Sequence, residues 1–542
     1  GWTSGRLDAP LRPQYRYRRD VDYCSGASLM VRADLFARLG GFDEHYAPAY
    51  CEDSDLAFRV RQAGYRVLYQ PRSRVIHYEG VTSGTDLAQG AKAHQVENAR
   101  KLHARWKDVL AHHGDPGENP HLARDRNIAG RVLVIDHTTP TPDQDAGSVT
   151  ALNLMRILQS QGMKVTFVPE DNMLYLPRYT TEMERMGIEC LTSPHVGNLK
   201  SHLAECGHVY DLAIFFRVEN ATRHLDDLAF YCPRARIVYH TADLPFPRTE
   251  RQAEVEGSAA LRAHAADLKE RELEAMRRTH ATIVHSAAEK RLLDGLLGWE
   301  GASRIFVMGW AIPIPGTKVP FKDRDGIVYV GGFQHSPNLD AVDFFLRDIF
   351  PRVRSRLPQA RFLIVGSRLP ERLARLEMPG VEAVGFVPDL PPLLDRCRLS
   401  VAPLRYGAGT KGKIYTSLSQ GLPCVSTTIG AEGMNLADGV DVLVADDPEA
   451  FAGRVVALHE DEALWNRLSA AGLRFLEEHA SMEAGTAVVV ALLRPLGFEG
   501  ASRRTSLPAP GDALPAETVV SDPARYERFV ASEPAARQRR QG

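Results

Sequence analysis

The sequence predicts an α/β protein with two doubly wound, Rossmann-like domains in tandem, preceded by a smaller, partial α/β domain. Short apolar runs rich in Val, Ile and Phe recur between segments of helical length over residues 130–497. Such alternation is typical of parallel sheets with helices on both faces. A glycine-rich stretch with two lysines, residues 405–413, directly follows one of these runs. In doubly wound folds, ligands bind at this edge of the sheet.

The composition is that of an ordinary globular protein. The chain has 542 residues, of which 44% are hydrophobic and 25% charged, and its net charge is −2. This length predicts roughly three or four domains. The near-neutral charge gives no reason to expect a nucleic-acid partner. No apolar run reaches the ~18 residues that a membrane-spanning helix needs.

The cysteines and the first residues add two expectations. Seven cysteines are scattered without a Cys-x-x-Cys pair, which predicts buried thiols rather than a disulfide or zinc framework. No secretory signal is visible. The chain begins at Gly1 and its first twenty residues show no strong periodicity, so we expect it to be the C-terminal part of a longer polypeptide.

Residues 1–114 are predicted to form the first unit, in which acidic residues open a helix. Residues 49–71 read as a turn, a helix and a strand. Glu52, Asp53 and Asp55 fall in the first turn of this helix, where carboxylates suit the positive end of the helix dipole. The spacing leaves open whether Glu52 and Asp53 simply cap the helix or take part in chemistry.

A second domain is expected after a helix and a linker. Residues 93–110 carry apolar side chains at helical spacing, and residues 115–129 are a polar linker with Pro and Gly. The domain over residues 130–318 begins with a strand, a loop, a helix and a strand. The loop, residues 140–148, should lie at the ligand edge, and so should His240, which closes a later strand. A histidine in this place is more often structural than catalytic, so both roles stay open.

The third domain, residues 319–497, contains the glycine-rich loop. Glycines allow the backbone to approach a ligand closely, and a helix N-terminus offers free N–H groups to an anion. Lys411 and Lys413 add positive charge. The pattern predicts a site for a phosphate-bearing ligand, and a tight turn with solvated lysines is the alternative. Residues 498–542, rich in Pro, Ala, Ser and Arg, are expected to be a disordered tail, for which a partner-binding role stays open.

Four motifs follow one another in residues 21–80: GASLMVRADLF, GGFDE, the Glu52–Asp53 pair and GYRVLYQPRSRVIHYEG. In this order they resemble the C-terminal half of inverting, family 2-type glycosyltransferases of the GT-A fold. The resemblance implies that Asp53 is the general base for the acceptor hydroxyl and that Glu52 shapes the acceptor site. It also implies that His77 completes a Mg or Mn site with an Asp-x-Asp motif. That motif and the donor-binding half are absent from this sequence, so we expect the half-domain by itself to be inactive.

Five further motifs span residues 130–497: PDQDAGS, YHTADL, VGGFQHSPNLDAV, RYGAGTKGKIYTSLSQGLPCVSTTIGAEGM and DDPEAFA. Together they resemble a complete retaining, family 4-type glycosyltransferase of the GT-B fold. The resemblance implies a nucleotide-sugar donor and no required metal, because basic residues and helix N-termini hold the leaving diphosphate. It places His240 near the donor sugar. The residues that it assigns to donor binding are Gly147, Ser148, Gly331, Gly332, Gly407, Gly409, Lys411, Gly412, Lys413 and Glu432.

The sequence departs from the usual pattern of that family at four positions. The two glutamates of the family, separated by seven residues, correspond to Ala408 and Thr416, and its Arg and Lys correspond to Gly332 and Pro337. The usual ribose-binding carboxylate and two phosphate-binding cations are therefore missing. The cations available as substitutes are Lys411, Lys413, Arg405 and His335. Because the GAG-x-KGKI form resembles a subgroup of the family, we interpret the departures as a subtype.

The sequence thus predicts a hexosyl-type glycosyltransferase of the bacterial cell envelope. It would transfer a sugar, with retention, from a nucleotide-sugar to a growing surface polysaccharide or lipid-linked glycan. One alternative is a bifunctional enzyme whose completed GT-A domain adds a second sugar with inversion. Another is a non-catalytic GT-B module that binds nucleotide-sugar or glycan, which Ala408 and Thr416 keep open. We expect a cytoplasmic protein; peripheral contact with the inner face of the membrane is open, although no amphipathic anchor is evident.

Overall fold

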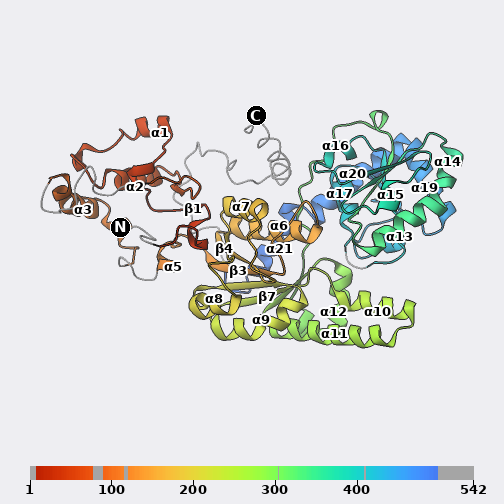
Figure 1. Ribbon diagram of the computed structural model, residues 1–542, viewed down its shortest axis with the longest axis horizontal. Helices are drawn as coiled ribbons and strands as arrows, with labels where there is room; N and C mark the ends of the chain where they lie inside the picture. Colours follow the sequence, from red (N-terminus) through yellow and green to blue (C-terminus); the bar gives the residue numbers. More distant parts are fainter. Residues whose placement is uncertain (1–7, 77–89, 115–119, 303, 408–409, 499–542) are drawn as a thin grey trace. The chain divides into compact units, whose positions relative to one another are not determined.

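The computed structural model describes residues 8–76, 90–114, 120–302, 304–407 and 410–498. It is an α/β structure with two large sheets (Figure 1), which confirms the predicted fold class. Within the described residues, no helix combines the length and apolar character needed to cross a membrane. The tail predicted to be disordered lies outside the described residues apart from its first residue, Phe498.

The N-terminal part, residues 8–114, is small and mostly helical. Its two short strands, β1 (Arg19–Asp20) and β2 (Leu68–Tyr69), pair antiparallel. A buried apolar cluster lies between α1 and α2 and includes Leu35, Leu56 and Val60. Its helices are α1 (Ala33–Arg38), α2 (Glu52–Gln62), α3 (His94–Arg105) and α4 (Lys107–Leu110).

The predicted apolar stripe of the last helical segment is partly wrong. Of the apolar residues at helical spacing in 93–110, Trp106 is buried but Val96 is 47% exposed, whereas the polar Asn98 is buried. Asn98 Nδ2 donates to the carbonyl oxygens of Tyr46 and Ala49 at 2.7 and 2.8 Å. Hydrogen bonds to the turn before α2 therefore orient this segment, and the segment breaks between α3 and α4 at Trp106.

The first large sheet has seven strands in the order β5-β4-β3-β6-β7-β8-β9. β6 to β9 pair in parallel, and so do β4 and β5. β6 is buried along its whole length, as expected for parallel strands with both faces covered. The strands are β3 (Gly130–Asp136), β4 (Met163–Pro169), β5 (Glu189–Cys190), β6 (Leu212–Phe216), β7 (Arg236–His240), β8 (Ala281–Val284) and β9 (Ile305–Val307).

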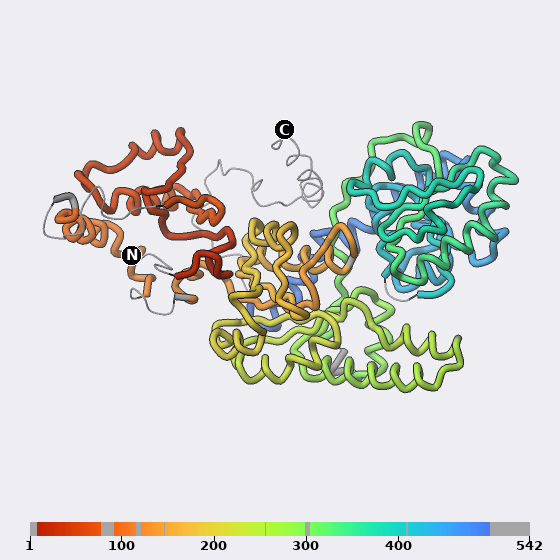
Figure 2. Tube along the Cα trace, viewed as in Figure 1, coloured from red at the N-terminus to blue at the C-terminus, as the bar shows by residue number. Residues whose placement is uncertain are grey.

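Helices connect these strands as the alternation predicted. They are α6 (Ala146–Ser160), α7 (Pro177–Arg185), α8 (Leu199–Cys206), α9 (Val218–Tyr231), α10 (Pro245–Glu256), α11 (Ala259–Arg278) and α12 (Ala287–Ala302). α10 and α11 run side by side (Figures 1 and 2). The stretch predicted to be a linker is not wholly irregular, because it contains the short helix α5 (Pro120–Ala123).

The second large sheet has six strands in the order β12-β11-β10-β13-β14-β15, and all of them pair in parallel. The chain order reverses between β10 and β13, which makes this point the expected ligand crevice of a doubly wound sheet. The strands are β10 (Ile327–Val330), β11 (Phe362–Val365), β12 (Val381–Gly385), β13 (Leu399–Ala402), β14 (Cys424–Ser426) and β15 (Leu443–Val444).

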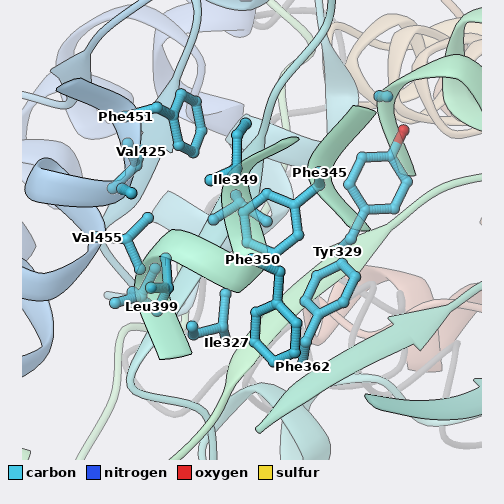
Figure 3. Close-up of a cluster of buried hydrophobic side chains, with 14 of the residues drawn as sticks. Ile327, Tyr329, Phe345, Ile349, Phe350, Phe362, Leu399, Val425, Phe451 and Val455 are labelled. Carbon is cyan, nitrogen blue, oxygen red and sulfur yellow. The ribbon is translucent and has the colours of Figure 1, made fainter. Parts of the chain in front are cut away.

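A cluster of aromatic rings fills the core on one face of this sheet (Figure 3). The Phe345 and Phe362 ring centroids are 4.4 Å apart, and those of Phe350 and Phe362 are 5.8 Å apart. Tyr329 lies beside them, with its hydroxyl pointing away from the phenylalanine rings. The surrounding helices include α13 (Ser336–Phe344), the π-helix η7 (Phe345–Ile349), α14 (Phe350–Arg356), α15 (Glu371–Ala374), α16 (Pro391–Leu394) and α19 (Pro448–Glu460).

The helices α17 (Gly412–Ser419) and α18 (Thr428–Ala431) lie between β13 and β15 in the chain. The helices α20 (Glu462–His479) and α21 (Met482–Leu493) follow α19 at the end of the domain. α21 packs against α6, and Asn153 of α6 donates to the Ala311 carbonyl at 2.8 Å. A Cβ on Gly485 of α21 would lie 2.5 Å from Ala311 Cβ. This close packing requires glycine in α21. The predicted boundary between the two domains falls between β9 and β10, and its position stays a prediction.

The cysteines agree largely with the expectation. Five of the seven are buried, whereas Cys24 and Cys51 are half-buried. Burial raises the pKa of the Cys424 thiol to about 12. All seven are free thiols, so the prediction of thiols rather than disulfides is confirmed, and burial is complete for five of them.

Candidate functional site

The loops after β10, β11 and β13 meet at the point where the strand order of the second sheet reverses. Gly331 and Gly332 follow β10, as the sequence predicted. Gly366, at the end of β11, has φ +148°, and a Cβ there would lie 1.7 Å from the Gly331 carbonyl oxygen. The two backbones are thus in direct contact, which only a residue without a side chain permits. Sequence analysis did not single out Gly366, so its role was missed.

Asn338, in the first turn of α13, connects this turn to the glycine-rich loop. Its Nδ2 donates to the Gly332 carbonyl at 2.7 Å, and its Oδ1 accepts from the Tyr329 hydroxyl at 2.9 Å. A Cβ on Gly331 would lie 3.0 Å from Tyr329 Cε1 and 3.1 Å from Asn338 Cγ. Sequence reasoning missed Asn338, although it lies in the quoted motif VGGFQHSPNLDAV.

Lys411 and Lys413 lie at the start of α17, and both are withdrawn from solvent. Lys411 is 8% exposed, and Lys413 is half-buried, with its Nζ 2.6 Å from Asn338 Oδ1 and 5.0 Å from the Tyr329 ring centroid. Burial lowers the pKa of Lys411 to about 8. Burial and then repulsion from Lys411 lower the pKa of Lys413 to about 7. The alternative of solvated lysines is therefore wrong for Lys411, whereas Lys413 stays partly exposed, and ligand binding by both stays a prediction.

The glycines of the glycine-rich loop that the structure describes also lie close to Lys411 or at the start of α17. Gly412 is the first residue of α17, and a Cβ on Gly407 would lie 3.5 Å from Lys411 Cε. Gly409 and Ala408 lie outside the described residues. Thr416, which occupies the position of a family glutamate, is half-buried in α17. Buried cations beside glycine turns and a helix N-terminus are suited to a ligand with several negative charges.

The other cations proposed as substitutes are placed differently. The Arg405 guanidinium binds the Asp340 carboxylate, with Nε 2.9 Å from Oδ2. This hydrogen bonding raises the pKa of Arg405. His335 is exposed at the N-cap of α13 and makes no capping bond with its side chain. The partner Asp340 was not anticipated, and phosphate binding by Arg405 and His335 stays a prediction.

Glu432, after α18, forms an ion pair with α10. Arg251 donates to both carboxylate oxygens at 2.6 and 2.7 Å. This hydrogen bonding lowers the pKa of Glu432, and Lys411 lowers it further. Its carboxylate therefore lies near both Arg251 and Lys411, and contact with a donor stays a prediction.

The first sheet also reverses its strand order, between β3 and β6, and Gly147 and Ser148 lie at that edge. The Ser148 hydroxyl donates to Asp145 Oδ2 at 2.6 Å and accepts from the Thr141 amide at 2.8 Å. These bonds hold the loop in shape. Gly147 lies beside Arg217, whose Nη2 would be 3.5 Å from a Cβ at that position.

Arg217 was missed by sequence reasoning. It follows β6 with a φ of 71°, an uncommon conformation for a residue with a side chain. Its Nε donates to Asp136 Oδ1, at the end of β3, at 3.1 Å. Strained residues often mark functional sites, but no local pattern in the sequence reveals a backbone angle.

His240, at the end of β7, is fully buried and neutral. Its ring stacks on Phe216 with 4.1 Å between centroids, and its Nδ1 accepts from the Ala242 amide at 3.2 Å. Burial lowers its pKa well below the usual range, helped by His285 and Arg217. Within the part of the chain that is described, its Nε2 has no hydrogen-bond partner. A buried nitrogen of this kind is available for a ligand hydroxyl.

In the N-terminal part, Glu52 and Asp53 open α2 after two residues in the left-handed conformation, Tyr50 and Cys51. Asp53 Oδ2 accepts from the Gly26 amide at 2.7 Å, and Oδ1 accepts from the Ser54 amide at 2.6 Å. Glu52 Oε2 is buried without a hydrogen-bond partner among the described residues. Asp53 thus joins the helix start to a distant segment, which is more than simple capping.

The metal site implied by the GT-A resemblance stays a prediction. His77 lies outside the described residues, and the sequence has no Asp-x-Asp pair before the acidic helix. Among the residues that the structure describes, no group of three or more His, Cys, Asp or Glu is placed to hold a metal ion. No catalytic step is therefore assigned to a metal.

Comparison with known proteins supports the predicted families. Residues 324–461 match the family model described as glycosyl transferases group 1. The N-terminal region matches rhamnosyltransferases over part of their length. A Mycobacterium tuberculosis H37Rv N-acetylglucosaminyl-diphospho-decaprenol L-rhamnosyltransferase is 38% identical over 93 residues, which are 17% of this chain and 29% of the relative. Escherichia coli K12 rhamnosyltransferase WbbL is 47% identical over 58 residues, 11% of this chain and 22% of the relative.

The chain thus spans less than a third of the length of these two relatives. Among solved structures, Anabaena HepE in complex with UDP superimposes with a TM-score of 0.51 at 15% identity, over 67% of this chain and 100% of HepE. Thermosynechococcus elongatus sucrose-phosphate synthase has a TM-score of 0.51 at 14% identity, over 68% of this chain and 99% of the synthase. At these identities the likeness concerns the fold, and it confirms the GT-B prediction.

Proposed function

We propose that this chain is a glycosyltransferase that moves a sugar from a nucleotide-sugar donor to a growing bacterial surface polysaccharide or lipid-linked glycan. The observation that carries the proposal is the pair of withdrawn lysines, Lys411 and Lys413, where the strand order of the second sheet reverses. Positive charge held away from water favours a multiply charged anion such as a nucleoside diphosphate. The match of residues 324–461 to group 1 glycosyl transferases supports this reading.

The site suits the charge changes of sugar transfer. When the bond from the sugar to the diphosphate breaks, negative charge grows on the leaving diphosphate. The two lysines and the N-terminus of α17 would stabilise that charge, as preorganised donors do in other enzymes. The free Nε2 of His240 would hold a sugar hydroxyl. The resemblance to family 4-type enzymes implies no required metal for residues 130–497, so we expect EDTA to leave this turnover unchanged.

The acceptor class rests on the relatives. One relative of the N-terminal region is named N-acetylglucosaminyl-diphospho-decaprenol L-rhamnosyltransferase, which supports a lipid-linked acceptor for the polypeptide that carries this region. Such an acceptor favours a cytoplasmic protein with peripheral contact at the inner face of the membrane. Retention of configuration follows from the resemblance to family 4-type enzymes.

The experiment is a turnover assay with the full chain and a panel of UDP-, GDP-, ADP- and dTDP-sugars, with donor hydrolysis and transfer both measured. Lys413→Ala should lower kcat/KM by about 100-fold, because it removes one donor to the leaving diphosphate. The matched control is Lys322→Ala, an exposed lysine in the same half of the chain. Nucleotide binding without turnover for every donor would favour the non-catalytic module, and unchanged turnover in Lys413→Ala would refute the assignment.

A second candidate function is transfer by a GT-A domain that includes residues 8–114. The partner-free Glu52 oxygen and the fixed Asp53 carboxylate at a strained helix start favour it. In a polypeptide that carries the donor-binding half, Asp53→Asn should abolish a metal-dependent activity and leave the Lys413-dependent activity intact. Loss of both activities, or of neither, would contradict a bifunctional enzyme.

A further inference from the structure

The Tyr329–Asn338–Lys413 cluster contains a polar side chain whose amide orientation is fixed by chemistry. A backbone carbonyl can only accept hydrogen bonds, so the atom of Asn338 that lies 2.7 Å from the Gly332 oxygen must be Nδ2. The Oδ1 then faces Lys413 Nζ, 2.6 Å away, and accepts from it. Asn338 is 9% exposed, so its three partners hold it in place.

Neutral groups and one cation surround Lys413. Tyr329 of β10 presents its ring face, 5.0 Å from Nζ, and burial raises the pKa of its hydroxyl well above the usual range. Cys424 of β14 has its pKa raised to about 12, and Lys411 repels Lys413 from the same loop. The Asn338 oxygen is therefore the acceptor that orients the ammonium among the described residues.

We infer that Asn338 is a positioning residue that aims the Lys413 ammonium at the diphosphate of the donor and couples it to the Gly331–Gly332 turn. The inference rests on the proposed function. An amide serves here better than a carboxylate, because it orients the lysine without neutralising the charge that the ligand requires. The same side chain links the turn after β10 to the start of α17, which follows β13.

The test is the pH dependence of nucleoside diphosphate binding by the full chain, with UDP, GDP, ADP and dTDP as probes. Wild-type affinity should fall as Lys413 loses its proton. In Asn338→Asp the carboxylate should hold that proton, so the inflection should move upward by about one pH unit and the affinity at pH 6 should fall about tenfold. Asn435→Asp makes the same change at an exposed asparagine in the same half of the chain and should leave the inflection unchanged.

A second comparison separates positioning from a structural effect. In a Lys413→Met background the inflection assigned to Lys413 should be absent with or without Asn338→Asp, whereas a structural defect of Asn338→Asp would still lower the temperature of thermal unfolding. If Asn338→Asp does not fold, Asn338→Ser should still bind about tenfold more weakly. An unchanged inflection in Asn338→Asp, with normal binding by the wild type, would overturn the inference and leave the proposed function standing. Absence of binding by the wild type would refute the proposed function itself.

Discussion

At the scale of residues, the surroundings of Lys413 decide its charge. The half-buried ammonium has one hydrogen bond to Asn338 and a second cation, Lys411, in the same loop. The sequence revealed the two lysines and the glycines because these residue types have an obvious use in anion binding. It did not reveal Asn338 or Arg217, because their roles depend on contacts and backbone angles formed only in the folded chain. Glu432 was found, but its partner Arg251 was not.

Binding of a nucleoside diphosphate should take up protons. The pKa values of Lys413 and Lys411 are lowered to about 7 and about 8, and a bound anion would raise both. At pH 6 both lysines are already protonated, so uptake should be near zero. At pH 8 uptake should approach about one proton per ligand. Calorimetric titrations in buffers with different ionisation enthalpies measure it directly, and proton release at pH 8 would contradict the assigned pKa shifts.

At the scale of elements, most strands were predictable and several junctions were not. The apolar runs of β3, β6 and β7 are largely buried, as their composition indicated, and β6 and β7 pair in parallel. The buried face of the α3 segment was predicted only in part, because Asn98 is oriented by hydrogen bonds that periodicity does not report. The DDPEAFA motif proves to be a capped helix start, in which Asp447 accepts from the amides of Glu449 and Ala450.

The contact between the ends of β10 and β11 can be tested at Gly366. Gly366→Ala would place a Cβ 1.7 Å from the Gly331 carbonyl oxygen, so we expect a loss of more than about 2 kcal/mol in the free energy of unfolding. The displaced turn should also weaken binding of nucleoside diphosphates.

The matched control is Gly439→Ala, which has a positive φ of +74° but no neighbouring atom within 4 Å. It should cost about 1 kcal/mol, from backbone strain alone. Denaturant unfolding measures both variants. Equal losses would show that the contact with Gly331 contributes nothing beyond strain.

At the scale of the whole molecule, two doubly wound sheets with reversed strand order each bring loops to a ligand edge. The tandem arrangement followed from the alternation of strands and helices over residues 130–497. The packing of α21 against α6 could not be predicted from that alternation, because it depends on the close contact of Gly485 with Ala311. The second sheet carries the withdrawn lysines, and the first carries His240 and Arg217 at its own edge. The central claim is that the lysine edge of the second sheet holds a nucleoside diphosphate.

The most direct measurement is equilibrium binding of UDP, GDP, ADP and dTDP to the full chain and to a Lys411→Met/Lys413→Met variant at pH 7. The account predicts that at least one nucleoside diphosphate binds the wild type and that the variant binds it about 100-fold more weakly, since both cations facing the diphosphate are gone. Thermal unfolding of the Lys411→Met/Lys413→Met variant should remain cooperative. Equal affinity of the two proteins, or no binding of any of the four by the wild type, would contradict the claim.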